Sequence, residues 1–340
     1  MLVAEEIKEN EELRVTIMNM SKTVKKPIPL FVHYGFLGGV SCSAIVSVDN
    51  ESHLAVGTTC GKCTLFSPRT HLCTSTIHID PNGRSVVSVG QFTKDCIFIH
   101  IRAYAILLFS VDRTSKIREI LSFCLTRTIK TEFYGFCGAF CHRSQLFCPF
   151  LQNDKCLIGV FAGITEQMSR VWSLDDATAF MAFAISDNGY LACGFETGGV
   201  KIVNIEDFSI IDEVLKKLFS EPVLACASFA NTLAVSSVKS PLILINIRMN
   251  GINNDKEILF PQKAGGCSSL SFSNSGKELA SGYWNGTVRI NSVKTGAIRA
   301  VLDFHFETIN CLCWTKIDNQ RLLFVCSKDT KLSIWNLYND

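Results

Sequence analysis

The 340-residue chain has few charged side chains and almost no excess of either sign. Asp, Glu, Lys and Arg together make up 19% of it, and the formal net charge is +2. So small a net charge gives no overall field that would attract DNA, RNA or anionic lipid, although a local basic patch can still exist. We therefore expect no direct contact with nucleic acid.

Long apolar segments are also missing. No run of eighteen apolar residues occurs, and the apolar residues 103–111 are too few to span a bilayer but suit a buried strand. The first 20 residues include Glu5, Glu6 and Glu9 and have neither the basic start nor the apolar centre of a secretory signal. We expect no membrane attachment and a location in the cytosol, the nucleus or both.

Cysteine, in contrast, is abundant, with 16 residues in a chain that is 47% hydrophobic. In a small secreted domain this number would indicate disulfides. Here many cysteines lie inside apolar runs, as Cys193, Cys267 and Cys326 do, and free cysteine in a reducing compartment behaves as a small core hydrophobe. The composition therefore predicts a large folded core with free thiols.

Short apolar segments separated by Asn, Asp and Gly recur along the chain, which is typical of strands joined by hairpin turns. Residues 180–185, 190–194, 200–205 and 209–211 form one complete unit. Seven such units can be counted, and their first strands are predicted over 41–48, 86–92, 136–141, 180–185, 222–229, 267–272 and 309–314. The second and fifth units show only three segments each, and the third is the least regular.

The seventh unit has no segment for its outer strand, whereas residues 29–34 have no partner of their own. An open ring would leave long unpaired strand edges, so we predict that this N-terminal segment completes the last unit. The fold class is then all-β: a single seven-bladed β-propeller over residues 29–340, preceded by a tail of residues 1–28.

The clearest repeats lie near the C-terminus. The turn Tyr283-Trp284-Asn285-Gly286 and the turn Ser327-Lys328-Asp329 are spaced by 44 positions between Asn285 and Asp329, within the period of a WD repeat, and Trp335-Asn336 follows the second turn. These residues resemble the WD-repeat β-propellers. Together with residues 194–200, 221–223 and 300–305, they are similar to the family of guanine nucleotide-binding protein subunit beta-like protein 1 and its fungal counterpart, ASTRA-associated protein 1.

This resemblance implies a non-enzymatic adaptor, and not a heterotrimeric G-protein subunit. Members work with the co-chaperone machinery that assembles phosphatidylinositol-3-kinase-related kinases, and in fungi they are assigned to a chromatin-linked complex. The implied partners are helical-repeat co-chaperone subunits or kinase-related clients, with the chain as a monomer inside a hetero-complex. The alternatives are a scaffold of another complex, such as a ubiquitin ligase or a ribosome-associated assembly, and a zinc-binding propeller.

The WD resemblance also implies a buried set of His, Ser, Asp and Trp in regular blades. The last blade keeps His305, Asp329 and Trp335, but Val325 stands at the serine position. The preceding blade keeps Ser281 but has Asn285 and Asn291 in place of Asp and Trp, respectively. We assign His305, Asp329, Trp335 and Ser281 structural roles, and expect packing to hold the more divergent blades.

Two patterns suggest chemistry, and each has a plainer interpretation. His305 with Asp329 could be a catalytic dyad, but no nucleophile is indicated beside them. The Cys60-Gly61-Lys62-Cys63 segment has the spacing of a zinc knuckle, but Cys42, His71 and Cys73 lack the spacing of a second ligand pair. We therefore assign no catalytic residue, no metal site and no cofactor, and leave metal binding by Cys60 and Cys63 open.

Trp284 is the strongest candidate for partner binding. It lies at the tip of a tight turn, where packing is least able to bury it, and exposed aromatic residues are enriched in binding hot spots. Folding of the ring onto an adjacent loop is the alternative. Loops on the same face of the ring are predicted to add further contacts: Phe306, Glu196, Lys239 and Lys328.

Overall fold

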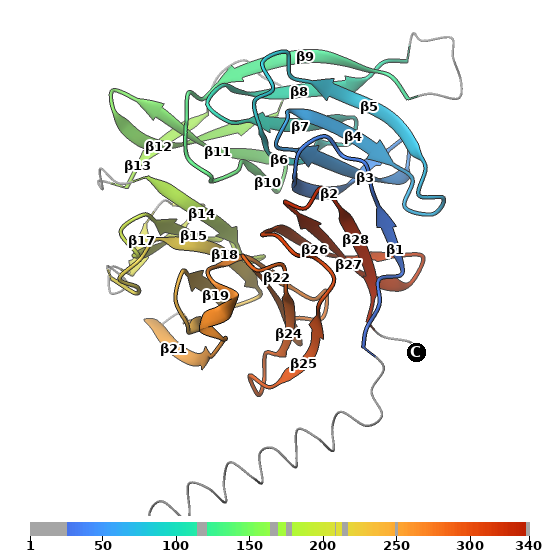
Figure 1. Ribbon diagram of the computed structural model, residues 1–340. Helices are drawn as coiled ribbons and strands as arrows, with labels where there is room; N and C mark the ends of the chain where they lie inside the picture. Colours follow the sequence, from blue (N-terminus) through green and yellow to red (C-terminus); the bar gives the residue numbers. More distant parts are fainter. Residues whose placement is uncertain are drawn as a thin grey trace, which may run out of the picture.

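Seven sheets surround a central axis in the computed structural model, which describes residues 26–113, 121–163, 169–174, 179–207, 209–212, 217–248 and 251–337 (Figure 1). In this part of the chain, each sheet has four antiparallel strands. The predicted seven-bladed β-propeller is therefore confirmed. No helix among these residues is long and apolar enough to cross a membrane.

The first three blades follow one another along the chain, each beginning with its innermost strand. Blade 1 comprises β2 (Val40–Val48), β3 (Glu51–Thr58), β4 (Lys62–Phe66) and β5 (Cys73–Ile79). Blade 2 comprises β6 (Val86–Thr93), β7 (Cys96–Ile101), β8 (Ala105–Val111) and β9 (Phe123–Lys130). Blade 3 comprises β10 (Phe140–His142), β11 (Gln145–Gln152), β12 (Lys155–Ala162) and β13 (Arg170–Ser173).

The remaining blades keep this order until the ring closes. Blade 4 comprises β14 (Phe180–Ile185), β15 (Tyr190–Phe195), β16 (Val200–Asn204) and β17 (Ile210–Asp212). Blade 5 comprises β18 (Val223–Phe229), β19 (Thr232–Ser237), β20 (Leu242–Arg248) and β21 (Gly251–Ile258). Blade 6 comprises β22 (Cys267–Phe272), β23 (Glu278–Tyr283), β24 (Val288–Ser292) and β25 (Ile298–Leu302), and blade 7 contains β26 (Ile309–Ile317), β27 (Gln320–Ser327) and β28 (Leu332–Asn336).

Blade 7 takes its outer strand from the other end of the chain. Strand β1 (Phe31–His33) pairs antiparallel with β28, with Val32 opposite Ser333, and the Leu30 amide donates to the Ile334 carbonyl at 2.7 Å. Figure 1 shows the two strands side by side at the rim. The predicted closure is confirmed, while residues 1–25 of the predicted tail lie outside the described residues.

Tight two-residue turns link the first two strands of several blades, and the sequence explains them. Asp49 and Asn50 both have positive φ, as do Asp318 and Asn319 in blade 7. Two successive positive φ values define the hairpin turn whose twist matches that of the strands, and Asn and Asp tolerate this conformation. Each turn therefore sets the register of its hairpin locally.

Three sequence-based strand predictions need correction. Strand β10 covers only Phe140–His142. Phe136, which was predicted to lie in this strand, is in the preceding loop together with Gly135 and Gly138. The outer strands β9 and β21 had no predicted counterpart. In β9, most side chains are exposed or half-buried, and an outer strand facing solvent lacks the apolar run that marks a buried strand.

Polar side chains on the inner strands join neighbouring blades. The Ser41 hydroxyl donates to the Val86 carbonyl at 2.6 Å, Ser268 donates to Ile309 at 2.8 Å, and the Asn310 amide crosses the closure to the Val40 carbonyl at 2.8 Å. These bonds satisfy carbonyls at edges that the sheets themselves leave unpaired. They also fix the positions at which the inner strands begin.

His100 forms a comparable link between blades 2 and 3 and should make stability depend on pH. It is fully buried, its Nδ1 accepts a hydrogen bond from the Ala139 amide at 3.1 Å, and burial lowers its pKa to about 4. The unfolded chain takes up this proton below about pH 6.5 whereas the folded chain does so only near pH 4, so stability should be lost across that window.

We expect this residue alone to remove about 1.4 kcal/mol of unfolding free energy per pH unit between about pH 6.5 and pH 4. Urea titrations at several pH values measure the slope. His100→Asn keeps an acceptor for the Ala139 amide but does not titrate. The dependence of its unfolding free energy on pH should therefore be weaker by the amount that one proton contributes. An unchanged slope in this variant would contradict the assignment.

Candidate partner-binding face

One face of the ring collects the loops that join consecutive blades and the turns between the second and third strands. This upper face also carries the start of each inner strand. Among the described side chains, the exposed aromatic ones all lie here except Phe31 of β1: Tyr34, Tyr134, Phe136, Trp284 and Phe306. Clustered exposed aromatic groups are typical of protein interfaces.

The centre of the upper face is hollow. A cavity of about 620 Å³ opens where the inner strands begin, and its lining comes from every blade, including Ser41, Val86, Ser268 and Asn310. Apolar groups from Met181 and Leu224 form part of its wall. We call this cavity, with Phe136, Trp284 and Arg102 also lining it, the channel mouth.

Trp284 lies at the edge of the channel mouth. Its side chain is 42% exposed, and its backbone amide donates to the Gly266 carbonyl at 3.0 Å. A Cβ on Gly266 would approach the indole ring to 2.7 Å, so the ring lies against a backbone surface that only glycine provides. Both sequence interpretations therefore hold in part, because Trp284 rests on the adjacent loop and still presents ring area to solvent.

The other predicted partner-binding residues also lie on the upper face, at different blades. Phe306 is largely exposed beside Lys331, whose ammonium is 4.5 Å from the ring centre. Glu196 and Lys328 are exposed in the turns of blades 4 and 7. Lys239 forms an ion pair with Glu221, so its charge is already balanced.

A buried chain of hydrogen bonds holds the loop that carries Phe306. Both carboxylate oxygens of Asp329 lie 3.0 Å from Nδ1 of His305, and Nε2 of His305 lies 2.7 Å from the Ser333 hydroxyl. The indole Nε1 of Trp335 donates to the same hydroxyl at 2.7 Å. Ser333 therefore supplies the hydroxyl that Val325, its cross-strand partner in β27, lacks.

Donor and acceptor chemistry sets the direction of this chain. Indole N–H can only donate and a carboxylate can only accept, so Ser333 accepts from Trp335 and gives its own proton to Nε2 of His305. With Nε2 accepting from Ser333, the Nδ1–H group of His305 donates to Asp329. Burial acts to raise the pKa of Asp329, but hydrogen bonds with His305 and Ser327 and the nearby charge of Lys331 outweigh it and lower that pKa.

This arrangement is architectural. The side chains of His305 and Asp329 are 2% and 0% exposed, which leaves no room for a substrate at either group. Asp329 also lies 3.4 Å from the Phe306 amide, and the Lys328 amide donates to the Thr308 carbonyl at 2.9 Å. The network thus ties two upper-face loops together and fixes where Phe306 points.

Blade 6 replaces this network with another. The Ser281 hydroxyl lies 2.9 Å from the phenol oxygen of Tyr283, two residues along the same strand, and both side chains are buried. Asn285 accepts from the amide and hydroxyl of Thr287, and Asn291 donates to the Gly296 carbonyl. Ser281 is therefore a structural residue with Tyr283 as its partner.

The two thiols with knuckle spacing have different surroundings. Cys60 is exposed in a turn, whereas Cys63 is buried in β4. Burial raises the pKa of Cys63 to about 12, which disfavours the thiolate that a metal requires. Within the described part of the chain, no group of three or more His, Cys, Asp or Glu residues is arranged to hold a metal.

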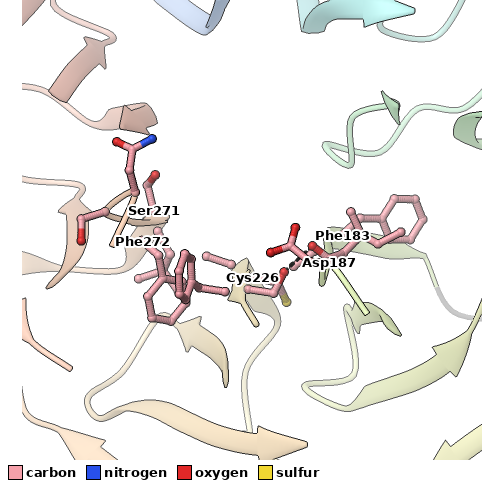
Figure 2. A pocket seen from close by; sticks show the side chains of 13 residues that line it. Phe183, Asp187, Cys226, Ser271 and Phe272 are labelled. Atoms are coloured by element: carbon pink, nitrogen blue, oxygen red, sulfur yellow. Dashed lines mark hydrogen bonds between the residues drawn. The ribbon is translucent and has the colours of Figure 1, made fainter. Parts of the chain in front are cut away.

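A second cavity, of about 470 Å³, opens on the lower face at blades 4 to 6. Figure 2 shows Phe183 and Asp187 on one side, Ser271 and Phe272 on the other, and Cys226 between them. Its Ser228 hydroxyl donates to the Ile185 carbonyl between two blades, and Ser273 bonds Glu278 within a turn. These polar groups serve the fold, and no exposed large apolar side chain lines this cavity.

Phe136 and Arg102, which line the channel mouth, were missed by the sequence-based analysis. Phe136 was assigned to a strand, although the glycines at 135 and 138 could have indicated a loop. Arg102 lies in a short turn with no motif around it. Only the ring brings these residues within one cavity with Trp284.

Comparison with known proteins agrees with the fold. Residues 234–317 match the anaphase-promoting complex subunit 4 WD40 domain. The chain is 29% identical over 173 residues to ASTRA-associated protein 1 of Schizosaccharomyces pombe, covering 45% of this chain and 46% of that protein. It is 39% identical over 62 residues to ASTRA-associated protein 1 of Schizosaccharomyces japonicus, covering 18% of this chain and 16% of that protein.

A further relative is the Set1 complex component swd1 of Schizosaccharomyces pombe, 39% identical over 75 residues, which cover 22% of this chain and 18% of that protein. The matches span less than half the length of each of these relatives. The chain is thus a β-propeller whose sequence resembles WD-repeat proteins, among them ASTRA-associated protein 1.

Proposed function

We propose that this chain is a non-enzymatic adaptor that binds protein partners on its upper face, in the cytosol or the nucleus. The observation that supports this most directly is that exposed aromatic side chains lie on this face and that two of them, Phe136 and Trp284, line a channel mouth with a partly apolar wall. Burying such groups against a partner releases free energy at little cost, because Trp284 is already held against Gly266.

A narrower proposal concerns the protein complex in which this chain works. The resemblance to ASTRA-associated protein 1 in two yeasts favours work with the co-chaperone machinery that assembles phosphatidylinositol-3-kinase-related kinases. In that role the chain would be a monomer within a hetero-complex. Its partners would be helical-repeat co-chaperone subunits or kinase-related clients.

A second candidate is a scaffold within a Set1-type complex. It is favoured by the similarity to the Set1 complex component swd1, which is more identical but covers a shorter segment than the match to the Schizosaccharomyces pombe ASTRA-associated protein 1. The two candidates share the adaptor chemistry and differ in the subunits that should bind.

Affinity purification of the tagged full-length chain from cells, with quantitative mass spectrometry, tests both. Trp284→Ala should reduce recovery of the main partner about tenfold or more, as expected for an interface hot spot. Gly266→Ala keeps the indole but its Cβ would displace the ring, so recovery should also fall. Leu72→Ala, at a 68% exposed side chain on the lower face, is the matched control and should change nothing.

The identity of the recovered proteins separates the candidates. Co-chaperone subunits or kinase-related proteins support the first, and Set1-complex subunits support the second. Recovery of neither from a well-folded chain contradicts both. Equal recovery with Trp284→Ala and Leu72→Ala would place the binding surface elsewhere.

A further inference from the structure

A strip of alternating cationic and aromatic side chains crosses the upper face at blade 2, beginning at the channel mouth. The guanidinium of Arg102 lies 4.0 Å from the centre of the Phe136 ring, and its Nε donates to the Tyr134 carbonyl at 2.9 Å. Farther out, the Tyr104 ring has the Arg84 guanidinium at 3.6 Å and the Lys130 ammonium at 3.7 Å. We call Arg84, Arg102, Tyr104, Lys130 and Phe136 the blade-2 strip.

The strip carries positive charge that its surroundings do not balance. Arg84 is neutralised by the buried Asp80, with nitrogen and oxygen 2.7 Å apart. Among the described residues, neither Arg102 nor Lys130 has a carboxylate within ion-pair distance, and the exposed Glu132 in the same loop forms no such pair. Elsewhere on this face, Lys239 and Lys331 are each paired with a carboxylate, whereas the exposed Lys328 forms no ion pair with a described residue.

The geometry prepares Arg102 for a ligand. Stacking on Phe136 and one bond to a backbone carbonyl hold the guanidinium in place, so little freedom remains to be lost on binding. Neither restraint uses the two terminal nitrogens. These nitrogens are the groups that form bidentate bonds to a carboxylate.

The strip is continuous with the channel mouth, whose wall is partly apolar. Arg102 and Phe136 line the channel mouth together with Met181, Leu224 and Trp284. Lys130 lies at the end of the outer strand β9, so the strip extends from the centre of the ring toward its rim (Figure 1). A ligand that fits both parts has an apolar side chain at one point and negative charges along an extended backbone.

We propose that the blade-2 strip and the channel mouth bind an acidic, extended peptide segment of a partner protein. An apolar side chain of this segment enters the channel mouth, and its carboxylates contact Arg102 and Lys130. Single-stranded nucleic acid fits less well, because the strip offers only two unbalanced cations for phosphates and part of the adjoining wall is apolar. The inference rests on the proposed adaptor function and specifies the chemistry of its partner.

Selection of binders from a random peptide library, with chains of about 12 residues, tests this on the full-length protein. We expect enrichment of Asp and Glu around one aliphatic or aromatic position. A synthetic peptide of the selected sequence should bind about tenfold more weakly to the double variant Arg102→Glu/Lys130→Glu. Affinity should also fall as salt rises, because Lys130 is exposed and Arg102 only half-buried.

Lys94→Glu is the matched control, because it makes the same kind of charge change in blade 2 at an exposed turn of the lower face. It should leave peptide affinity unchanged. Arg102→Ala/Lys130→Ala provides a second variant that introduces no new charge, and thermal unfolding of each variant verifies the fold. Failure to enrich any sequence, enrichment without acidic residues, or equal binding to the double variant would overturn the proposal.

A thymidine oligonucleotide that displaces the selected peptide at a concentration below that of the peptide would also overturn the proposal. The strip would then be a nucleic-acid site. Cellular purification with the same variants separates this inference from the adaptor function. If wild type and the double variant recover a partner equally, the adaptor function stands, but the blade-2 strip does not bind that partner. Acidic peptides selected without any cellular partner would support the strip and contradict the adaptor.

Discussion

Replacing Ser333 by alanine is expected to lower the free energy of unfolding by about 2–4 kcal/mol, because two buried polar groups lose their partner. Those groups are Nε2 of His305 and Nε1 of Trp335, each 2.7 Å from the Ser333 hydroxyl. His305 and Trp335 remain enclosed by the core, so water cannot readily replace the bond. Urea unfolding followed by tryptophan fluorescence measures the loss.

The cross-strand pairing of Val325 with Ser333 allows a stricter version of this experiment. Val325→Ser alone should destabilise, because it buries an additional hydroxyl in an apolar site. In the Ser333→Ala background, the same substitution should recover part of the stability, because it supplies a hydroxyl from the position typical of the WD repeat. The two effects should therefore be strongly non-additive.

Ser333→Thr, which keeps the hydroxyl, is the matched control and should cost less than Ser333→Ala. A loss below about 0.5 kcal/mol for Ser333→Ala would mean that the hydroxyl bonds contribute little net stability. Additive effects of the two substitutions would show that a hydroxyl at position 325 cannot reach His305.

The sequence was sufficient to predict the architecture because the fold repeats one local pattern. Inner strands alternate or run apolar, and turns such as Asp318-Asn319 contain residues that tolerate positive φ. Strand β9 escaped prediction because its side chains are mostly exposed or half-buried, and β21 because its sequence from Gly251 to Ile258 contains no apolar run. Even the closing strand was predictable, since an unpaired segment and an incomplete blade must be matched.

The site was less predictable because it depends on groups that lie far apart in the sequence. Trp284 could be singled out from its turn alone, but the contact of its indole with Gly266 is visible only in the folded propeller. Ser333 replaces the missing serine across a strand pair, so the register must be known before the substitution can be recognised. Arg102 belongs to no sequence motif. Its importance arises from the Phe136 ring beside it and from the lack of a described carboxylate within ion-pair distance.

Removing residues 1–34 is expected to destabilise the whole ring, because blade 7 then loses its outer strand. The deletion removes the three paired residues of β1 and the bond from Leu30 to Ile334. It also removes the packing of the buried His33 against Phe66, whose ring centres are 4.6 Å apart. Loss of this backbone pairing and buried area should cost about 3–6 kcal/mol.

Removing residues 1–25 is the matched control, since it keeps β1 and its pairing with β28. Calorimetry should show a melting temperature lowered by at least about 5 °C for the longer deletion and little change for the shorter one. The exposed edge of β28 should also pair with other molecules, so size-exclusion chromatography should detect association of the longer deletion only. Equal melting of the two deletions would mean that the sheets packed around the axis, rather than the pairing of β1 with β28, hold the ring closed.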